Sequence, residues 1–407
     1  MTTNSKNKAE LLAPAGNLEK LKWACEYGAD AVYFGTEFGS LRSFAGNFSF
    51  EDANSGLQYL HDRGKRGYIT LNIYPFSDEY ERIIDTARKL DEMNADALIV
   101  ADLGVFAELR KLGLNADLHI STQANTVSAQ TALAYAELGA KRVNLARELS
   151  CEQIIDLNDR TAGKIETEVF IHGSVCFSYS GRCAISDYLT GFAANRGECK
   201  HPCRWQYALV EEKRPGEYMP VYEDERGLYF FNSKELALFE YVHQLADAGV
   251  ASFKIEGRMK AIHYIATVVS FYRQVLDGRT FTWQEGMELL GRVPNRGYSR
   301  GFMKGGITPD DYSVGQSLSQ ANSRFVANAL HEKKDGKTVL EVRNKVHAGD
   351  ELEVLRPDGT LSKLKLPAPL LTSRGEKVEF ANNSQFVLID AELPAYSILR
   401  RIENCRA

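Results

Sequence analysis

Short apolar segments alternate with amphipathic segments along the first two-thirds of the chain, and this alternation restricts the fold more than any other feature. The apolar segments have the length of buried strands, and the segments between them have the spacing of apolar residues typical of helices. Strands are predicted at residues 10–13, 31–34, 68–73, 97–101, 118–121, 142–145, 168–171 and 252–255. Eight strand–helix units favour a (β/α)8 barrel of the TIM type, an α/β fold, over a doubly wound sheet, because no Gly-x-Gly-x-x-Gly turn follows the first strand.

Helices are predicted between these strands, and their ends carry recognisable signals. The predicted helices cover residues 17–27, 78–93, 104–112, 126–138, 152–157 and 235–246, and helix-like residues 261–276 lead from the last strand toward the C-terminal region. Asn17 stands where its side chain can cap the first helix, and Gly28, Asn94 and Gly249 stand where helices end before a strand. These signals support the same alternation.

The alternation breaks at two places, and each break predicts a separate part of the molecule. Residues 173–232 are too long and too polar for an ordinary loop between a strand and a helix. After about residue 315 the pattern changes to short strands separated by turns, which is typical of a small β-barrel or sandwich. We therefore expect a barrel domain at residues 1–314 with an insertion at 173–232, loop-like residues at 292–306, and a C-terminal β domain at 315–407.

Composition and charge exclude several classes of protein. Of 407 residues, 44% are hydrophobic, and we find no apolar run near the ~20 residues that span a bilayer. Residues 1–10 lack the apolar core of a signal peptide, so we expect a cytoplasmic protein that does not bind membranes. The net charge of −5 gives no general attraction to nucleic acid, so any site for a polyanion must be a local patch.

Four of the seven cysteines are crowded into 28 positions, which is unusual in a reducing compartment. They are Cys176, Cys183, Cys199 and Cys203, with spacing C-x6-C and then C-x3-C. Four thiolates from irregular loops suit an iron–sulfur cluster, whereas zinc sites usually show two short knuckles. Zinc ligation and inert burial are the alternatives. Cys25, Cys151 and Cys405 have no such neighbours.

Polar residues follow many of the predicted strands, and in a barrel such positions line one shared mouth. Those that we expect to bind a substrate are Asn72, Gln123, Arg147, Lys254 and Arg258. Guanidinium groups hold carboxylates with paired hydrogen bonds, so the cations indicate an anionic small molecule. His172, four residues before Cys176, is a candidate catalytic residue, although a lone histidine is more often a packed one. Caps and surface ion pairs are the alternative for the rest.

Two basic segments contain aromatic residues, a combination that suits RNA, because cations follow phosphates and aromatic rings stack on bases. The candidate RNA-binding residues are Lys200, Arg204, Trp205, Arg296, Tyr298 and Arg300. Solvated basic loops are the alternative.

Several motifs resemble the collagenase-like peptidase family U32. They are LLAPAGN at residues 11–17, EVFIHGSVC at 168–176, GRC at 181–183, NRGEC at 195–199, PCR at 202–204, FKIEGR at 253–258 and NRGYS at 295–299. The resemblance runs from residue 10 to about 305. It is greatest to the branch that hydroxylates tRNA, because the third and fourth cysteines stand close together and a β domain follows.

This resemblance implies an oxygen-independent hydroxylase that forms 5-hydroxyuridine at the wobble position of tRNA, with prephenate as the hydroxyl donor. It implies that the four clustered cysteines hold a 4Fe–4S cluster. It also implies that Gln123, Arg147, Glu168 and His172 frame the small-molecule pocket, with Glu168 and His172 as catalytic residues. Some relatives work in pairs, so a homo- or hetero-oligomer is possible.

A peptidase and a zinc-stabilised RNA-binding module are the alternative functions. The chain has no Gly-x-Ser-x-Gly elbow and no His-Glu-x-x-His zinc helix, so a protease would need different machinery.

Overall fold

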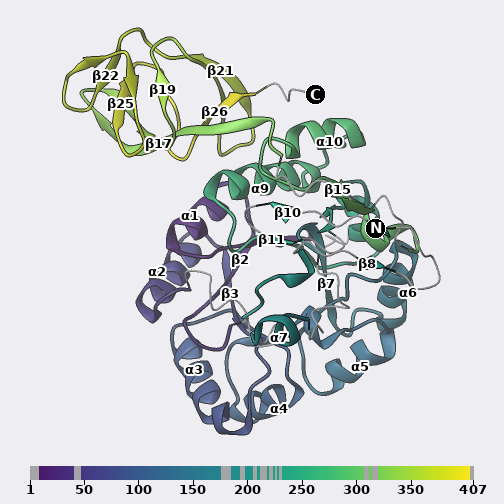
Figure 1. The fold of residues 1–407 in the computed structure, drawn as a ribbon. Helices are drawn as coiled ribbons and strands as arrows, with labels where there is room; N and C mark the ends of the chain where they lie inside the picture. Colours follow the sequence, from purple (N-terminus) through teal and green to yellow (C-terminus); the bar gives the residue numbers. More distant parts are fainter. Residues whose placement is uncertain are drawn as a thin grey trace, which may run out of the picture. The chain divides into compact units, whose positions relative to one another are not determined.

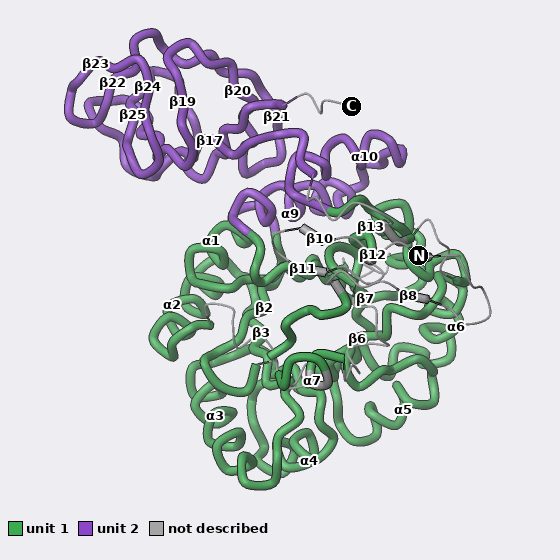
Figure 2. Tube along the Cα trace, viewed as in Figure 1, with its two compact units in different colours: residues 1–25, 29–260, 296–318 green, residues 26–28, 261–295, 319–407 purple. Residues whose placement is uncertain are grey.

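The structure is a computed structural model, shown as a ribbon in Figure 1. It describes residues 9–40, 47–175, 185–192, 198–204, 209–210, 218–219, 223–224, 227–228, 232–306, 311–313 and 320–403. The chain forms two compact units, one of residues 1–25, 29–260 and 296–318 and one of residues 26–28, 261–295 and 319–407 (Figure 2). The sequence predicts one boundary, after residue 314. In the structure, the second unit also includes residues 26–28 and 261–295. Each unit is described by itself.

The first unit is a closed barrel of parallel strands, as the alternation in the sequence predicts. Its strands are β1 (Glu10–Pro14), β2 (Ala31–Gly35), β3 (Arg66–Leu71), β4 (Ala97–Val100), β5 (Asp117–Ile120), β6 (Arg142–Asn144), β7 (Glu166–Gly173) and β14 (Ser252–Ile255). Each strand pairs with the next, and β14 pairs with both β7 and β1, which closes the barrel. The TIM-type fold is therefore confirmed.

Helices surround these strands (Figure 1). They are α1 (Leu18–Glu26), α2 (Phe50–His61), α3 (Tyr80–Glu92), α4 (Leu103–Leu112), α5 (Ala129–Glu137), α6 (Cys151–Thr161) and α8 (Val242–Asp247). The Asn17 side chain accepts a hydrogen bond from the Lys20 amide at 2.9 Å, which confirms the predicted cap. Gly28, Asn94 and Gly249 all have positive φ, as helix ends that lead into a strand require.

The predicted helix at residues 235–246 is wrong in its first half. Residues Glu235–Ala237 form strand β13, which pairs antiparallel with the end of β7, and only the later residues are helical, in η6 (Phe239–Tyr241) and α8. Strand β15 (Tyr298–Ser299) pairs in turn with β13, within the segment that the sequence predicts as a loop. We call residues 171–173, β13 and β15 the rim ribbon. It continues the barrel sheet beyond the mouth.

The insertion leaves the barrel after Gly173 and returns at the rim ribbon. Its described elements are α7 (Ile185–Thr190), η5 (Pro202–Arg204), β8 (Leu209–Val210), β9 (Tyr218–Met219), β10 (Glu223–Asp224), β11 (Gly227–Leu228) and β12 (Asn232–Ser233). β12 pairs with β16 (Tyr312–Ser313).

The second unit combines two helices with antiparallel strands, which confirms the predicted C-terminal β domain. The helices are α9 (Ile262–Leu276) and α10 (Trp283–Leu290), and the eight-stranded sheet has the order β21-β20-β26-β17-β18-β25-β22-β23. These strands are β17 (Ser323–Lys334), β18 (Lys337–Val342), β20 (Glu351–Leu355), β21 (Leu361–Lys365), β22 (Leu370–Thr372), β23 (Lys377–Val378), β25 (Phe386–Ile389) and β26 (Ile398–Ile402). A separate pair joins β19 (Val346–His347) to β24 (Phe380–Ala381).

Polar contacts inside the second unit tie its helices and turns to its sheet. Arg400 on β26 is buried, and it donates to Glu353 on β20 at 2.7 Å and to Thr267 on α9 at 3.1 Å. The Tyr27 hydroxyl lies 3.0 Å from the carbonyl oxygen of Leu355 and 2.8 Å from that of Tyr396. Within the described residues, no helix has the length and apolar character that crossing a membrane requires.

Candidate active site at the barrel mouth

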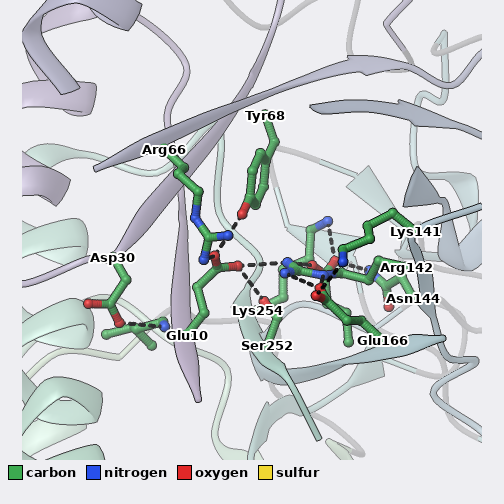
Figure 3. A network of polar contacts seen from close by, with 12 residues as sticks. Glu10, Asp30, Arg66, Tyr68, Lys141, Arg142, Asn144, Glu166, Ser252 and Lys254 are labelled. Carbon is green, nitrogen blue, oxygen red and sulfur yellow. Dashed lines mark hydrogen bonds and ion pairs between the residues drawn. The ribbon is translucent and has the colours of Figure 1, made fainter. Parts of the chain in front are cut away.

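Ionised side chains fill part of the barrel interior, beginning at the N-terminal ends of the strands (Figure 3). Glu10, the first residue of β1, is only 4% exposed. Its carboxylate accepts hydrogen bonds from Arg142 at 2.7 Å, Tyr68 at 2.7 Å and Ser252 at 2.9 Å, and it also pairs with Arg66. A buried carboxylate needs such partners, because burial alone strongly disfavours its charge.

Arg142 connects Glu10 to a second buried carboxylate, that of Glu168. Its Nη1 atom lies 2.7 Å from Glu10 Oε1 and 3.4 Å from Glu168 Oε2. Glu168 Oε1 also accepts from Lys254 Nζ and from Asn144 Nδ2, both at 2.8 Å. Alternating charges therefore run from Glu10 through Arg142 and Glu168 to Lys254.

Burial and neighbouring charges together shift the pKa values of Glu10 and Lys254. Burial tends to raise the pKa of Glu10, but Arg142, Arg66 and the hydrogen bond from Tyr68 outweigh it and hold the pKa below its usual range. Burial lowers the pKa of Lys254, and the attraction of Glu168 offsets only part of this effect.

Asn72 and Gln123, both predicted as substrate-binding residues, contact each other. Asn72 Nδ2 donates to Gln123 Oε1 at 2.7 Å, and Gln123 Nε2 donates to the Asn72 carbonyl at 3.1 Å. Tyr74 donates to the Gln123 carbonyl at 2.9 Å. The contacts fix two strand ends relative to each other.

Arg258 is buried and donates to two hydroxyl groups, and two glycines leave room for it. Its Nη1 atom donates to Ser40 Oγ at 2.7 Å and to Thr70 Oγ1 at 3.1 Å, and the residue is 5% exposed. A Cβ atom on Gly35 would lie 2.5 Å from this Nη1 atom, and one on Gly16 would lie 2.2 Å from the Arg258 carbonyl oxygen. The glycine of the LLAPAGN motif is therefore needed for the segment that carries Arg258.

Arg147 and Arg296 converge on Ser174, two residues before the first predicted cysteine ligand. Arg147 Nη1 donates to the Ser174 carbonyl at 3.0 Å, and Arg296 Nη2 donates to Ser174 Oγ at 3.2 Å. The Arg147 guanidinium also lies 4.0 Å from the centre of the Phe170 ring. Arg296, which we predict from the sequence to bind RNA, therefore lies at the barrel mouth.

His172 is part of the rim ribbon, and its side chain is buried. It is 1% exposed, and its ring centre lies 5.3 Å from that of Tyr298, another predicted RNA-binding residue. Burial, reinforced by the Lys260 ammonium, lowers the pKa of His172 to about 3. Its imidazole is therefore neutral at physiological pH.

Two of the four predicted cysteine ligands lie in the described part of the chain. Cys199 and Cys203 are both partly exposed, and the His201 amide donates to Cys199 Sγ at 3.4 Å. Cys176 and Cys183 lie outside the described residues. Lys200 places its ammonium 4.3 Å from the centre of the Phe192 ring.

The remaining predicted RNA-binding residues are described only in part. Arg300 pairs with Glu240 at 2.6 Å. Arg204 ends η5, and its side chain, like the whole of Trp205, lies outside the described part of the chain.

The sequence did not predict several residues of this region. Ser174 lies inside the EVFIHGSVC motif and Lys260 lies two residues after FKIEGR, so the motifs themselves were the available signal. Ser40 and Thr70 carried no signal. Nothing in the sequence indicated Glu235, because its segment is predicted as a helix.

Comparisons with known proteins agree on one family. The sequence profile described as Peptidase family U32 matches residues 16–311, and that described as Peptidase family U32 C-terminal domain matches residues 321–400. The tRNA hydroxylation protein P of Escherichia coli is 34% identical over 400 residues, covering 87% of this chain and 88% of the relative. The tRNA hydroxylation protein P1 of Bacillus subtilis is 37% identical over 358 residues, covering 86% and 84%. A protein named Collagenase from Porphyromonas gingivalis is 30% identical over 380 residues, covering 86% and 87%.

Proposed function

The chain belongs to peptidase family U32, and on that premise we propose that it is an RNA-modifying enzyme that hydroxylates tRNA. In its finer form, the proposal is that it produces 5-hydroxyuridine at the wobble position with prephenate as the hydroxyl donor. Two relatives named as tRNA hydroxylation proteins support it, because each alignment covers more than four-fifths of both chains.

The observation that carries the proposal is the group of cations at the mouth, two of which contact Ser174, two residues before Cys176 in the sequence. Arg147 and Arg296 both hold Ser174, and Lys254 lies deeper in the barrel against Glu168. A donor with two carboxylates, such as prephenate, is the kind of ligand that guanidinium groups bind.

A 4Fe–4S cluster is the cofactor that we propose, held by Cys176, Cys183, Cys199 and Cys203. The donor set is suitable, because all four are thiolate ligands and the His201 amide already donates to Cys199 Sγ. When bound, the cluster would supply electron transfer or a Lewis-acidic iron.

The protein's own side chains then bind and orient the reactants. Glu168 keeps one fixed position because Lys254 and Asn144 both donate to its Oε1 atom. His172, neutral because its pKa is about 3, would act through hydrogen bonding and not as a cation.

Nucleoside analysis of tRNA tests the function. Deleting the gene should abolish 5-hydroxyuridine, measured by mass spectrometry of digested tRNA, and the wild-type gene should restore it. An Arg147→Met variant should restore far less, whereas Arg160→Met, which alters an exposed ion pair with Asp156, should restore it fully. Unchanged 5-hydroxyuridine in the deletion strain would refute the proposal.

Metal and sulfide analysis tests the cofactor. Anaerobically purified protein should contain iron and acid-labile sulfide and absorb in the visible region, and Cys199→Ala should lose most of both. Zinc without sulfide would instead favour a zinc-stabilised RNA-binding module.

A peptidase is the second candidate, and the relative named Collagenase favours it. Casein or collagen hydrolysis by the purified protein that persists after iron removal, and is lost in a His172→Ala variant, would support that function.

A further inference from the structure

The rim ribbon places three side chains on one face of the sheet. Ala237 lies opposite His172 in the antiparallel pair of β13 and β7, and Glu235 lies beside Tyr298 in the parallel pair of β13 and β15. Since residues two apart on a strand share a face, Glu235 lies on the same face as His172 and Tyr298. Ala237 is small, so the rings of His172 and Tyr298 meet above it at 5.3 Å.

Glu235 is a buried carboxylate that is only half satisfied. It is 1% exposed, and its Oε1 atom accepts from Lys260 Nζ at 2.8 Å. Its Oε2 atom is buried and has no hydrogen-bond donor among the described residues. Leaving a buried charged acceptor unpaired is costly, so such a group calls for a partner that completes it.

The geometry points to a site for a pyrimidine base. We propose that Glu235 Oε2 accepts a hydrogen bond from the N3–H group of a uracil ring, that the Lys260 ammonium donates to a neighbouring carbonyl oxygen of that ring, and that Tyr298 stacks on it. This inference rests on the proposed function and names the residues that recognise its substrate base. Lys260 remains 28% exposed and Tyr298 is partly exposed, so a base can contact these two side chains from solvent and must enter beside them to reach the buried Glu235.

The arrangement distinguishes uracil from cytosine. Enzymes that modify a base take it out of the stack and read its Watson–Crick edge by hydrogen bonds and stacking. Uracil offers an N3–H donor beside a C4 carbonyl acceptor, which matches the Glu235 acceptor beside the Lys260 donor. Cytosine offers an N3 acceptor beside an amino donor, so both of its groups would face the wrong partner. Glu235 is therefore a specificity-determining residue.

Equilibrium RNA binding tests the inference without depending on catalysis. The probes are two anticodon stem–loop RNAs that differ only in a uridine or a cytidine at the wobble position, measured by fluorescence anisotropy with anaerobically purified protein. The wild type should prefer uridine by about tenfold, the discrimination expected of a paired hydrogen-bond contact. Glu235→Gln should reduce this preference to near one, because a carboxamide can turn to present either a donor or an acceptor.

Two further variants keep the test decisive. Tyr298→Leu should weaken binding of both RNAs equally, because stacking does not depend on which base is present. This measurement tests the inference even if the Glu235→Gln variant fails to fold. Glu341→Gln, which alters an ion pair with Arg343 in the second unit, should retain the uridine preference.

Equal binding of the two RNAs by the wild type, or a full uridine preference in Glu235→Gln, would overturn the inference and leave the proposed function standing. Absence of binding to either RNA would overturn both.

Discussion

Arg142 is a single side chain on which two buried carboxylates depend. Replacing it with methionine would leave Glu10 and Glu168 buried with one ionic partner fewer each, and removing one member of such a network costs about 3–5 kcal/mol. Urea unfolding of Arg142→Met should show a loss of this size. Arg160→Met, which breaks an exposed pair, is the control and should change little. Equal effects of the two variants would contradict the role of Arg142.

The same network predicts how stability depends on pH. The pKa of Glu10 in the folded protein lies below its ordinary value of 4.5. Its contribution to stability is therefore complete above that value and is lost as the pH falls through the folded pKa. The difference between wild type and Arg142→Met in urea unfolding should shrink in acid. A difference that is constant down to acidic pH would show that Glu10 is not the group responsible.

For residues at strand ends, the sequence could predict the location at the end of a barrel strand. Gln123 and Lys254 stand out because each is polar and ends or follows an apolar strand. Glu10 and Arg142 begin strands, where a charged residue ordinarily marks the exposed edge of the barrel. Glu235 gave no signal, because its burial results from pairing with segments far away in the sequence.

At the scale of elements, the loop after β1 closely approaches the loop after β14 at Gly16. A methyl group there would collide with the Arg258 backbone, so Gly16→Ala should destabilise the protein by about 1–3 kcal/mol, the usual cost of overpacking. Gly306→Ala is the matched control, since a Cβ atom at that position meets nothing within 4 Å. Thermal unfolding of the two variants measures the difference, and identical melting temperatures would exclude a close approach at Gly16.

Elements with a clear apolar pattern were predicted, and those without one were missed. Strands β2 and β4 are continuous apolar runs, and the other barrel strands contain apolar residues beside polar ones. Helix α2 is mostly polar, and its clearest signal is the Ser49 cap, whose side chain accepts from the Asp52 amide. Strand β17 is long, but the charged residues at its exposed C-terminal end hide the pattern.

At the scale of the whole molecule, each of the two units is built from segments that are not contiguous in the sequence. Tyr27 comes directly after the first barrel helix, yet its hydroxyl contacts Leu355 and Tyr396 in the second unit. Tyr27→Phe leaves two carbonyl groups without this donor, at a cost of about 1–3 kcal/mol. Hydrogen–deuterium exchange should therefore rise in β20 more than in β3.

Tyr68→Phe is the reciprocal variant, because its hydroxyl donates to Glu10 inside the barrel. It should raise exchange in the barrel strands and leave β20 unchanged. If Tyr27→Phe raised exchange mainly in the barrel, the assignment of residues 26–28 to the second unit would be wrong.

The sequence allowed the barrel and the antiparallel domain to be predicted, because both follow from local patterns. The rim ribbon and the division into units depend on pairings between distant segments, such as Gly173 with Leu236 and Glu235 with Tyr298. Such pairings leave no periodic trace in the residues that make them.

The pairing of β7 with β13 gives the insertion a particular topology: it is the loop of an antiparallel hairpin whose two arms are fixed to the barrel wall. The ends of such a loop stay together whatever lies between them, and each doubling of its length costs only about 0.6 kcal/mol in closure entropy. The length of the segment that carries the cysteines can therefore change in evolution while the eight barrel strands remain unchanged.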